Sequence, residues 1–103
     1  VSLSNINFFN RNADVSLIIG EKRCRNLRIA SEAISLIIDH GFNTLNLHKI
    51  NAGMVKSLES WSHFFQTAFG FKIEGIQKEQ VFKNGKFVDV INLGLLKTNF
   101  KSL

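Results

Sequence analysis

The sequence contains no tyrosine and no proline, and only one of its 103 residues is a cysteine. Without tyrosine, every mechanism that needs a phenol hydroxyl from this chain is excluded. Without proline, the turns fall to glycine and asparagine. The single cysteine, Cys24, excludes an internal disulfide framework and is typical of a reducing compartment, so we expect a cytoplasmic protein. No apolar run reaches the roughly 20 residues of a membrane-spanning helix, so no membrane partner is expected.

Apolar residues make up 45% of the sequence and charged residues 20%, which is the composition of a folded domain. The formal net charge of +5 suits nucleic acid, a membrane surface or a phosphate-rich ligand. Four of the 13 lysine and arginine residues, Lys22, Arg23, Arg25 and Arg28, form the one local cluster. One local cluster without a recognised nucleic-acid motif disfavours a nucleic-acid partner.

The spacing of the apolar residues predicts seven elements in one domain that covers residues 1–103. We expect strands at residues 1–9, 13–19, 44–50, 71–82 and 86–96, and helices near residues 30–41 and 56–69. Asn84-Gly85 predicts a type I′ hairpin turn, which needs a positive φ at both positions. The order β-β-α-β-α-β-β predicts an α/β (α+β) fold with a mixed, mostly antiparallel sheet and two helices. Its central β-α-β unit should pair its strands in parallel.

The segment with the most chemistry runs from a strand through Gly20 and the basic cluster into the first helix. A helix N-terminus presents unpaired N–H groups and a partial positive charge, and nearby arginines strengthen phosphate binding there. A solvated basic loop explains the same residues without any ligand. The residues alone therefore leave both interpretations open.

Other candidate residues favour structural roles. The three histidines, His40, His48 and His63, do not have the spacing of metal ligands, so no metal is expected. Cys24 has no evident partner for nucleophilic catalysis. A stripe of apolar residues with helical spacing favours core packing over a cofactor contact. The stripe consists of Met54, Leu58, Trp61, Phe65 and Ala68. The doublets Phe8-Phe9 and Phe64-Phe65 predict that one ring of each points outward.

Several stretches, in this order, resemble the GNAT superfamily of N-acetyltransferases. The branch they resemble most acetylates amino-sugar nucleotides or the N-termini of ribosomal proteins. The segment from Arg25 to Ala33 resembles the family's pyrophosphate-binding loop, and the other stretches resemble its strands and final hairpin. They are Asn12 to Val15 with Ile18 to Gly20, Phe42 with Leu45 to Ile50, Gly70-Phe71 with Glu74-Gly75, and Phe82 to Asp89.

The resemblance implies an acetyl-coenzyme A-dependent N-acetyltransferase that transfers an acetyl group to a primary amine of a small molecule or peptide. Acetyl-coenzyme A would lie in a cleft between strands 13–19 and 44–50. Asp14 falls where many relatives have a glutamate that helps to deprotonate the amine, so it is the implied base. The implied cofactor-binding residues are Leu17, Ile18, Ile19, Arg25, Asn26, Leu27, Arg28, Ile29, Ala30, Ser31, Leu58, Trp61 and Phe65.

Three departures from the family pattern support a second hypothesis, a non-catalytic GNAT-like binding or assembly module. The family's first loop glycine falls at Arg28, and its acid-donating tyrosine falls at Phe65, which has no hydroxyl. The family fold also has two helices and further strands before the part that this sequence matches, so we expect a fragment-like domain without them. Uncovered sheet edges then predict a homodimer or a higher oligomer.

Overall fold

A computed structural model describes residues 2–16, 27–56 and 59–100. In chain order the elements are β1 (Ser2–Asn7), β2 (Asn12–Ser16), α1 (Leu27–Asp39), β3 (Lys49–Val55), α2 (Glu59–Phe64), β4 (Lys72–Lys83) and β5 (Lys86–Leu96). Single π-helical turns, η2 (His40–Thr44) and η4 (Phe65–Phe69), continue the two helices, and a short 3-10 turn, η5 (Lys97–Asn99), follows β5. The predicted fold class and element order are confirmed. No helix among the described residues has the length and apolar character needed to cross a membrane.

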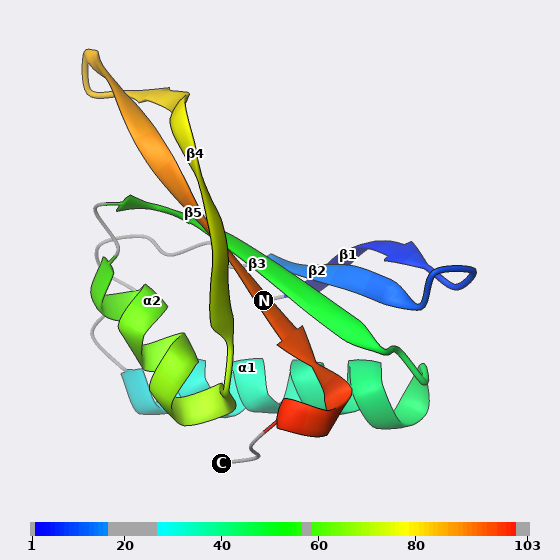
Figure 1. Ribbon diagram of the computed structural model, residues 1–103. Helices are drawn as coiled ribbons and strands as arrows, with labels where there is room; N and C mark the ends of the chain where they lie inside the picture. Colours follow the sequence, from blue (N-terminus) through cyan, green and yellow to red (C-terminus); the bar gives the residue numbers. More distant parts are fainter. Residues whose placement is uncertain (1, 17–26, 57–58, 101–103) are drawn as a thin grey trace.

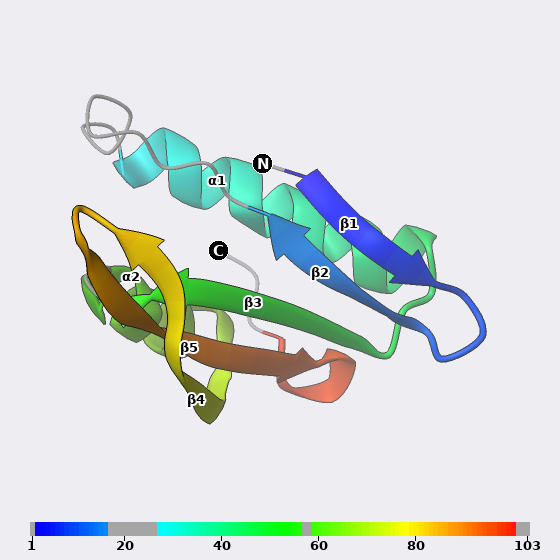
Figure 2. The same cartoon turned by 90° about the horizontal axis from the view of Figure 1, so that it is seen from above.

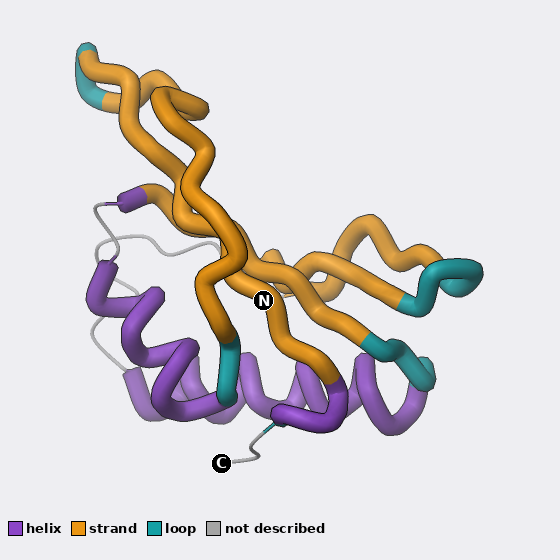
Figure 3. The backbone as a smooth tube through the Cα atoms, in the orientation of Figure 1, coloured by secondary structure: helices purple, strands orange, loops and turns teal. Residues whose placement is uncertain are grey.

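The elements form two layers, a five-stranded sheet and a pair of helices that cover the same face of it (Figure 1). Figure 3 shows the same separation of helices from strands along the backbone. Along β2, β3 and β5 buried residues alternate with more exposed ones. Ala13, Ile50 and Leu93 are buried toward the helices. Their neighbours therefore lie on the opposite side, which we call the helix-free face. It carries Asp14, Asn51, Gly53 and Asn92.

The strands lie in the order β1-β2-β3-β5-β4, and only the β2–β3 pair is parallel among the described pairs. This confirms the predicted parallel β-α-β unit. The parallel pairing is short and its last pair is Asp14 with Asn51. Beyond that point the two strands move apart toward their carboxyl ends (Figure 2). The sheet is therefore split into a β1–β2 half and a β3–β5–β4 half.

The core lies between the sheet and the helices. Ile34 and Ile38 lie one helical turn apart and therefore on the same side of α1, and Ser31 and Ser35 beside them are small enough to let the helix approach the sheet. From the other helix, the aromatic rings of Phe65 and Phe69 pack edge to face at 5.6 Å between centroids. Among the residues that the structure describes, the largest fully buried apolar side chains are Phe42, Phe65, Phe69, Ile34, Ile38, Leu47, Ile50, Leu93 and Leu95.

The predicted strand at residues 44–50 is largely wrong. The first helix continues through η2, and β3 begins only at Lys49. The helix expected near residues 30–41 does not end there, because Gly41 is buried inside η2. A Cβ atom there would lie 3.0 Å from the Ile50 side chain and 3.1 Å from that of Leu3. These side chains would have to shift by a few tenths of an ångström to admit a Cβ atom, so the glycine favours the close approach of the helix to the sheet, a reason that local sequence does not reveal.

Met54 was assigned to the stripe of the second helix, and this is also wrong. Met54 lies in β3 and is buried there. Its spacing to Trp61 fits a helix by coincidence, because a strand end and a helix start follow each other closely. The helix itself begins at Glu59, and its continuation η4 ends at Phe69, as expected, followed by Gly70 with a φ of 94°. The predicted strand 1–9 is shorter in the structure, where β1 ends at Asn7. The second strand begins at Asn12, and residues 17–19 of the predicted strand 13–19 lie outside the described part.

The Asn84-Gly85 hairpin is confirmed. The φ angles are 52° at Asn84 and 76° at Gly85, as a type I′ turn requires. Phe82 and Phe87 face each other across the turn, with ring centroids 5.0 Å apart. Both rings are more than 60% exposed on an arm that extends away from the body of the molecule (Figure 1).

Candidate functional site

A groove of about 750 Å³ lies on the helix-free face, where the two halves of the sheet separate. Asp14 and Val15 line it on the β2 side, and Asn51, Ala52 and Gly53 line it on the β3 side. β2 stays paired with β1 there, and β3 stays paired with β5 as far as Val55. The strand edges that face each other across the gap therefore present backbone N–H and C=O groups that this pairing does not use.

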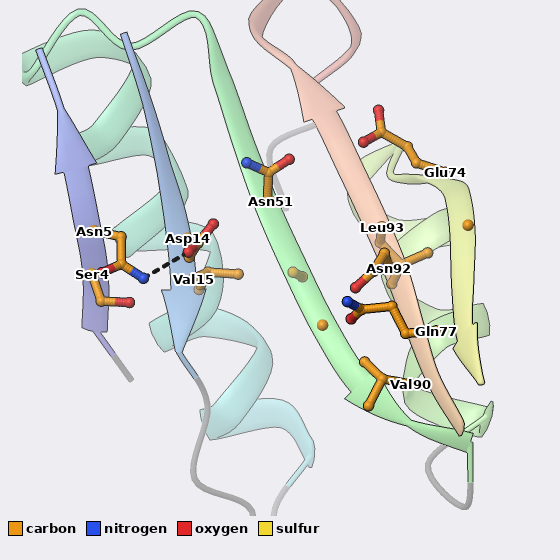
Figure 4. A pocket seen from close by; sticks show the side chains of 13 residues that line it. Ser4, Asn5, Asp14, Val15, Asn51, Glu74, Gln77, Val90, Asn92 and Leu93 are labelled. Atoms are coloured by element: carbon orange, nitrogen blue, oxygen red, sulfur yellow. Dashed lines mark hydrogen bonds between the residues drawn. The ribbon is translucent and has the colours of Figure 1, made fainter. Parts of the chain in front are cut away.

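The polar side chains of the groove are acidic or neutral (Figure 4). Two carboxylates, Asp14 and Glu74, stand on its two sides. Amides of Asn51, Asn92 and Gln77 lie between them. None of the lining residues in the described part of the chain is a lysine or arginine. On a chain whose net charge is +5, this surface favours a cationic ligand.

Asp14 is held in place by a bulge in the neighbouring strand. The β1–β2 register shifts between Ser4 and Asn7, and Asn5 in this bulge has a φ of 51°. The Asn5 amide nitrogen Nδ2 donates a hydrogen bond of 2.9 Å to the carboxylate oxygen Oδ2 of Asp14. Because Asp14 is also half-buried, its carboxylate is fixed at the start of the opening between β2 and β3. A fixed carboxylate beside a groove can accept a proton directly or through a water molecule.

A bulge also positions Glu74 at the groove. The β4–β5 register shifts between Ile73 and Gly75, so Glu74 lies in a bulge. Its carboxylate lies directly over Gly94 of β5, in the space that a Cβ atom would need. The Lys49 ammonium nitrogen Nζ lies 2.9 Å from the Glu74 oxygen Oε1. The side chains remain 32% and 45% exposed, respectively, so this ion pair is open to solvent.

Of the implied cofactor-binding residues, Leu17, Ile18, Ile19, Arg25, Asn26 and Leu58 lie outside the described part of the chain. The next four, Leu27, Arg28, Ile29 and Ala30, form the first turn of α1, and Ser31 follows, buried, in the same helix. The start of α1 lies at the end of the molecule toward which β2 and β3 diverge (Figure 2). The roles of these residues in binding stay predictions.

Trp61 and Phe65 lie in the aromatic part of the core. Phe65 is 1% exposed, and its ring lies 5.2 Å from that of Phe71 and 6.4 Å from that of Trp61. Both side chains therefore pack in the core, which is the interpretation that the sequence favours for this stripe. In the second doublet Phe65 is buried, and Phe64 is half-buried and packs against the core rather than standing clear of it. In the first doublet Phe8 and Phe9 are both exposed, where only one outward ring was predicted.

Glu74, Asn51, Asn92 and Asn5 were not singled out as site residues. A signal for two of them was present. Asn51 stands between the buried Ile50 and Ala52, and Asn92 likewise stands between the buried Ile91 and Leu93. The role of Glu74 depends on a bulge and that of Asn5 on a positive φ, and neither is readable locally. Among the described residues, no three acidic, histidine or cysteine side chains gather in a way that could hold a metal ion.

Comparison with known proteins identifies the family. Residues 1–91 match the family described as "Acetyltransferase (GNAT) domain". The spermidine N(1)-acetyltransferase of Vibrio cholerae is 30% identical over 100 residues, which is 97% of this chain and 57% of that protein. The Escherichia coli K12 enzyme of the same name is 29% identical over 97% of this chain and 53% of its own length. The sequence alone had pointed to the amino-sugar and ribosomal-protein branch.

Solved structures of the Vibrio cholerae spermidine N-acetyltransferase have the same fold. Its complex with CoA and spermine matches with a TM-score of 0.83 at 30% identity, over 94% of this chain and 56% of the other. A structure described as dodecameric matches equally well, over 93% and 55%. The chain thus spans little more than half the length of the curated relatives named here. With the split sheet, the order of elements and these matches, the chain belongs to the GNAT family of acetyltransferase domains.

Proposed function

We propose that this chain carries out acetyl-coenzyme A-dependent N-acetylation of an organic amine. The observation that carries the proposal is the opening between β2 and β3, with the Asp14 carboxylate at its start. The amine acceptor would lie in the groove of the helix-free face. The lone Cys24 is consistent with a cytoplasmic setting for this reaction.

The residues of the opening fit acetyl-coenzyme A. Two strand edges that face each other offer backbone N–H and C=O groups, and these pair well with an amide-containing arm. The first turn of α1 and the basic residues Arg25 and Arg28 would bind the pyrophosphate, through backbone N–H groups and guanidinium contacts. When bound, acetyl-coenzyme A supplies an acetyl group activated as a thioester.

Asp14 would act on the acceptor. An alkylamine is protonated at neutral pH and cannot attack a carbonyl until it loses that proton. The Asp14 carboxylate, oriented by Asn5, would accept the proton directly or through one water molecule. The amides of Asn51 and Asn92 line the groove next to it and can orient the acceptor by hydrogen bonding.

The acceptor that fits best is a polyamine. The groove is lined by carboxylates and amides, without a lysine or arginine among its described lining residues. This lining attracts a multiply charged cation and repels an anionic sugar nucleotide. The relatives named spermidine N(1)-acetyltransferase support the same class of substrate.

Self-association is the second part of the proposal. The outer edges of the sheet are β1 and β4, and large apolar side chains are exposed near both: Phe8 and Phe9 at the β1–β2 turn, and Phe82 and Phe87 on the hairpin arm. We infer a homodimer or a higher oligomer, in keeping with the relative described as dodecameric. Sedimentation equilibrium should show association; a monomer at high concentration contradicts it.

The catalytic proposal is tested with the full chain, acetyl-coenzyme A and spermidine, by following the release of free coenzyme A thiol. Asp14→Asn should lower kcat by about 10²- to 10⁴-fold, the contribution typical of a general base. Asp39→Asn, on an exposed residue of α1 that bonds to Asn43, is the matched control and should leave the rate unchanged. If acetyl-coenzyme A binds but no acetyl group is transferred, the result would instead favour the second hypothesis, a non-catalytic module. Phe65, in place of the family's tyrosine, supports that hypothesis.

A further inference from the structure

Two features of the sheet position the Glu74 carboxylate, whereas an ordinary surface carboxylate requires neither. A bulge interrupts the β4–β5 register at this residue, and the carboxylate lies against Gly94 of β5, where a Cβ atom would displace it. Bulges commonly re-aim a side chain beside a functional site, and a glycine within a strand commonly admits a close neighbour. Both features act on the same carboxylate, which they bring onto the helix-free face at the border of the groove.

We propose that Glu74 determines acceptor specificity by binding the second cationic centre of a diamine or polyamine, and that Lys49 occupies this position until such an acceptor arrives. The inference rests on the proposed function and deepens it. It assigns the reacting amine to Asp14 and the distal ammonium to Glu74.

The register sets the distance between the two carboxylates. Asp14 pairs with Asn51, and Asn51 pairs with Gly94, so the three residues form one row across β2, β3 and β5. Neighbouring strands are about 4.8 Å apart, so Asp14 and Gly94 are separated by roughly 10 Å. The Glu74 carboxylate lies over Gly94. An acceptor must therefore carry two amino groups along an extended chain to engage both carboxylates, whereas a monoamine can engage only one.

Lys49 shows which chemical group Glu74 accepts. Its side chain ends in a primary alkylammonium, the same group that ends an alkyl diamine, and its Nζ atom lies 2.9 Å from Oε1 of Glu74. The pair is partly exposed, and exposed ion pairs contribute little to stability. A substrate ammonium can replace that of Lys49 at small cost. Lys49 would then weaken amine binding, and its removal should strengthen it.

The test measures amine binding to the full chain by calorimetry, without acetyl-coenzyme A. The two probes are 1,4-diaminobutane and 1-aminobutane, which have the same carbon chain. The diamine should bind more tightly. Glu74→Gln should weaken diamine binding by about tenfold, the size of one charge-assisted hydrogen bond, and leave monoamine binding within about twofold. Lys49→Met should change diamine binding in the opposite direction.

Two further variants guard against a folding artefact. Glu79→Gln removes a carboxylate from the same strand but outside the lining of the groove, and it should leave both affinities unchanged. Gly94→Ala keeps every charge but displaces the Glu74 carboxylate, and it should reproduce the selective loss of diamine binding. Thermal unfolding of each variant checks that the fold is retained.

Indistinguishable affinities of the two amines would overturn the inference. So would equal weakening of both amines by Glu74→Gln, or weaker diamine binding in Lys49→Met, because a purely structural ion pair predicts these results. The proposed function fails separately. If no acetyl transfer occurs but diamine binding follows the pattern above, the enzymatic proposal is wrong and Glu74 remains an ammonium receptor. If transfer occurs with equal KM for both amines in wild type and Glu74→Gln, only the inference is wrong.

Discussion

At the residue scale, Gly70 adopts a backbone conformation that other residue types rarely adopt. Gly70 ends the second helix with a φ of 94°, and the backbone carbonyl oxygen of Asn99 occupies the space that a Cβ atom would need. The strain and the collision act together, because neither can be relieved by rotating a side chain. This junction joins η4 to the start of β4 and thereby sets where β4 begins.

Gly70→Ala should therefore lower the free energy of unfolding by at least about 2 kcal/mol, since a left-handed non-glycine residue alone costs of order 1–3 kcal/mol. Urea denaturation measures the change. Gly75→Ala is the matched control, because its φ is not in the left-handed region and a Cβ atom there would meet nothing within 4 Å. A loss of similar size at both positions would show that the Gly70 conformation is not the cause.

Asp89 gives the fold a pH dependence that can be assigned to one residue. Its carboxylate accepts a hydrogen bond of 2.8 Å from the backbone N–H of Glu79 in the second bulge of β4, and Lys78 lies 3.4 Å away. The backbone hydrogen bond has the largest effect and, together with Lys78, outweighs the opposing effect of desolvation, so the pKa of Asp89 is held below its ordinary value of 3.8. Because the pKa is lower in the folded state, ionised Asp89 stabilises the fold.

This stabilisation should be complete above the unfolded pKa of about 4 and should be lost as the pH falls through the lower pKa of the folded state. Urea unfolding at pH 7 and at successively lower pH values measures it. Asp89→Asn keeps an oxygen that can accept the Glu79 N–H, yet it cannot ionise. The variant should lose this part of the pH dependence, and an unchanged pH profile would assign the effect elsewhere.

At the scale of elements, local signals predicted some structures and failed for others. The β4–β5 hairpin was predictable because its turn requires two positive φ angles and Asn84-Gly85 supplies them within two residues. The end of α1 and the start of β3 were not, because Gly41 packs closely against Ile50 and Leu3 inside η2 rather than ending a helix. Long-range contacts decided these boundaries, and a single sequence does not display them.

The rings at the hairpin tip provide a test at this scale. Phe82 and Phe87 lie directly opposite each other on β4 and β5. Their ring centroids are 5.0 Å apart, and the angle between the ring planes is 70°. A double-mutant cycle with Phe82→Ala and Phe87→Ala should give a coupling free energy of about 0.5–1.5 kcal/mol. A second cycle that combines Phe82→Ala with Phe8→Ala should give no coupling free energy, because Phe8 lies at the opposite turn of the sheet and substitutions at distant sites are additive. Coupling between Phe82 and Phe8 would indicate contact between copies of the chain.

At the scale of the whole molecule, the split sheet is the feature on which the account depends. The family resemblance predicts a cofactor cleft between the second and third strands, with Asp14 as the base beside it. The structure has a groove at that place. The acidic side opposite Asp14 could not be predicted. Glu74 reaches it only through a bulge and through Gly94, which is 20 residues away in the sequence.

The central claim is that the opening binds acetyl-coenzyme A, and calorimetric titration of acetyl-coenzyme A into the full chain tests it most directly. We expect saturable binding that Arg25→Ala weakens by about tenfold or more, because charge-assisted phosphate contacts contribute roughly 1.5–3 kcal/mol each. Arg28→Gly restores the family's residue and should tighten binding by admitting a closer approach of the backbone to the pyrophosphate. Lys86→Ala, at the hairpin turn, should have no effect. No binding heat, or an affinity unchanged in both arginine variants, would contradict the account.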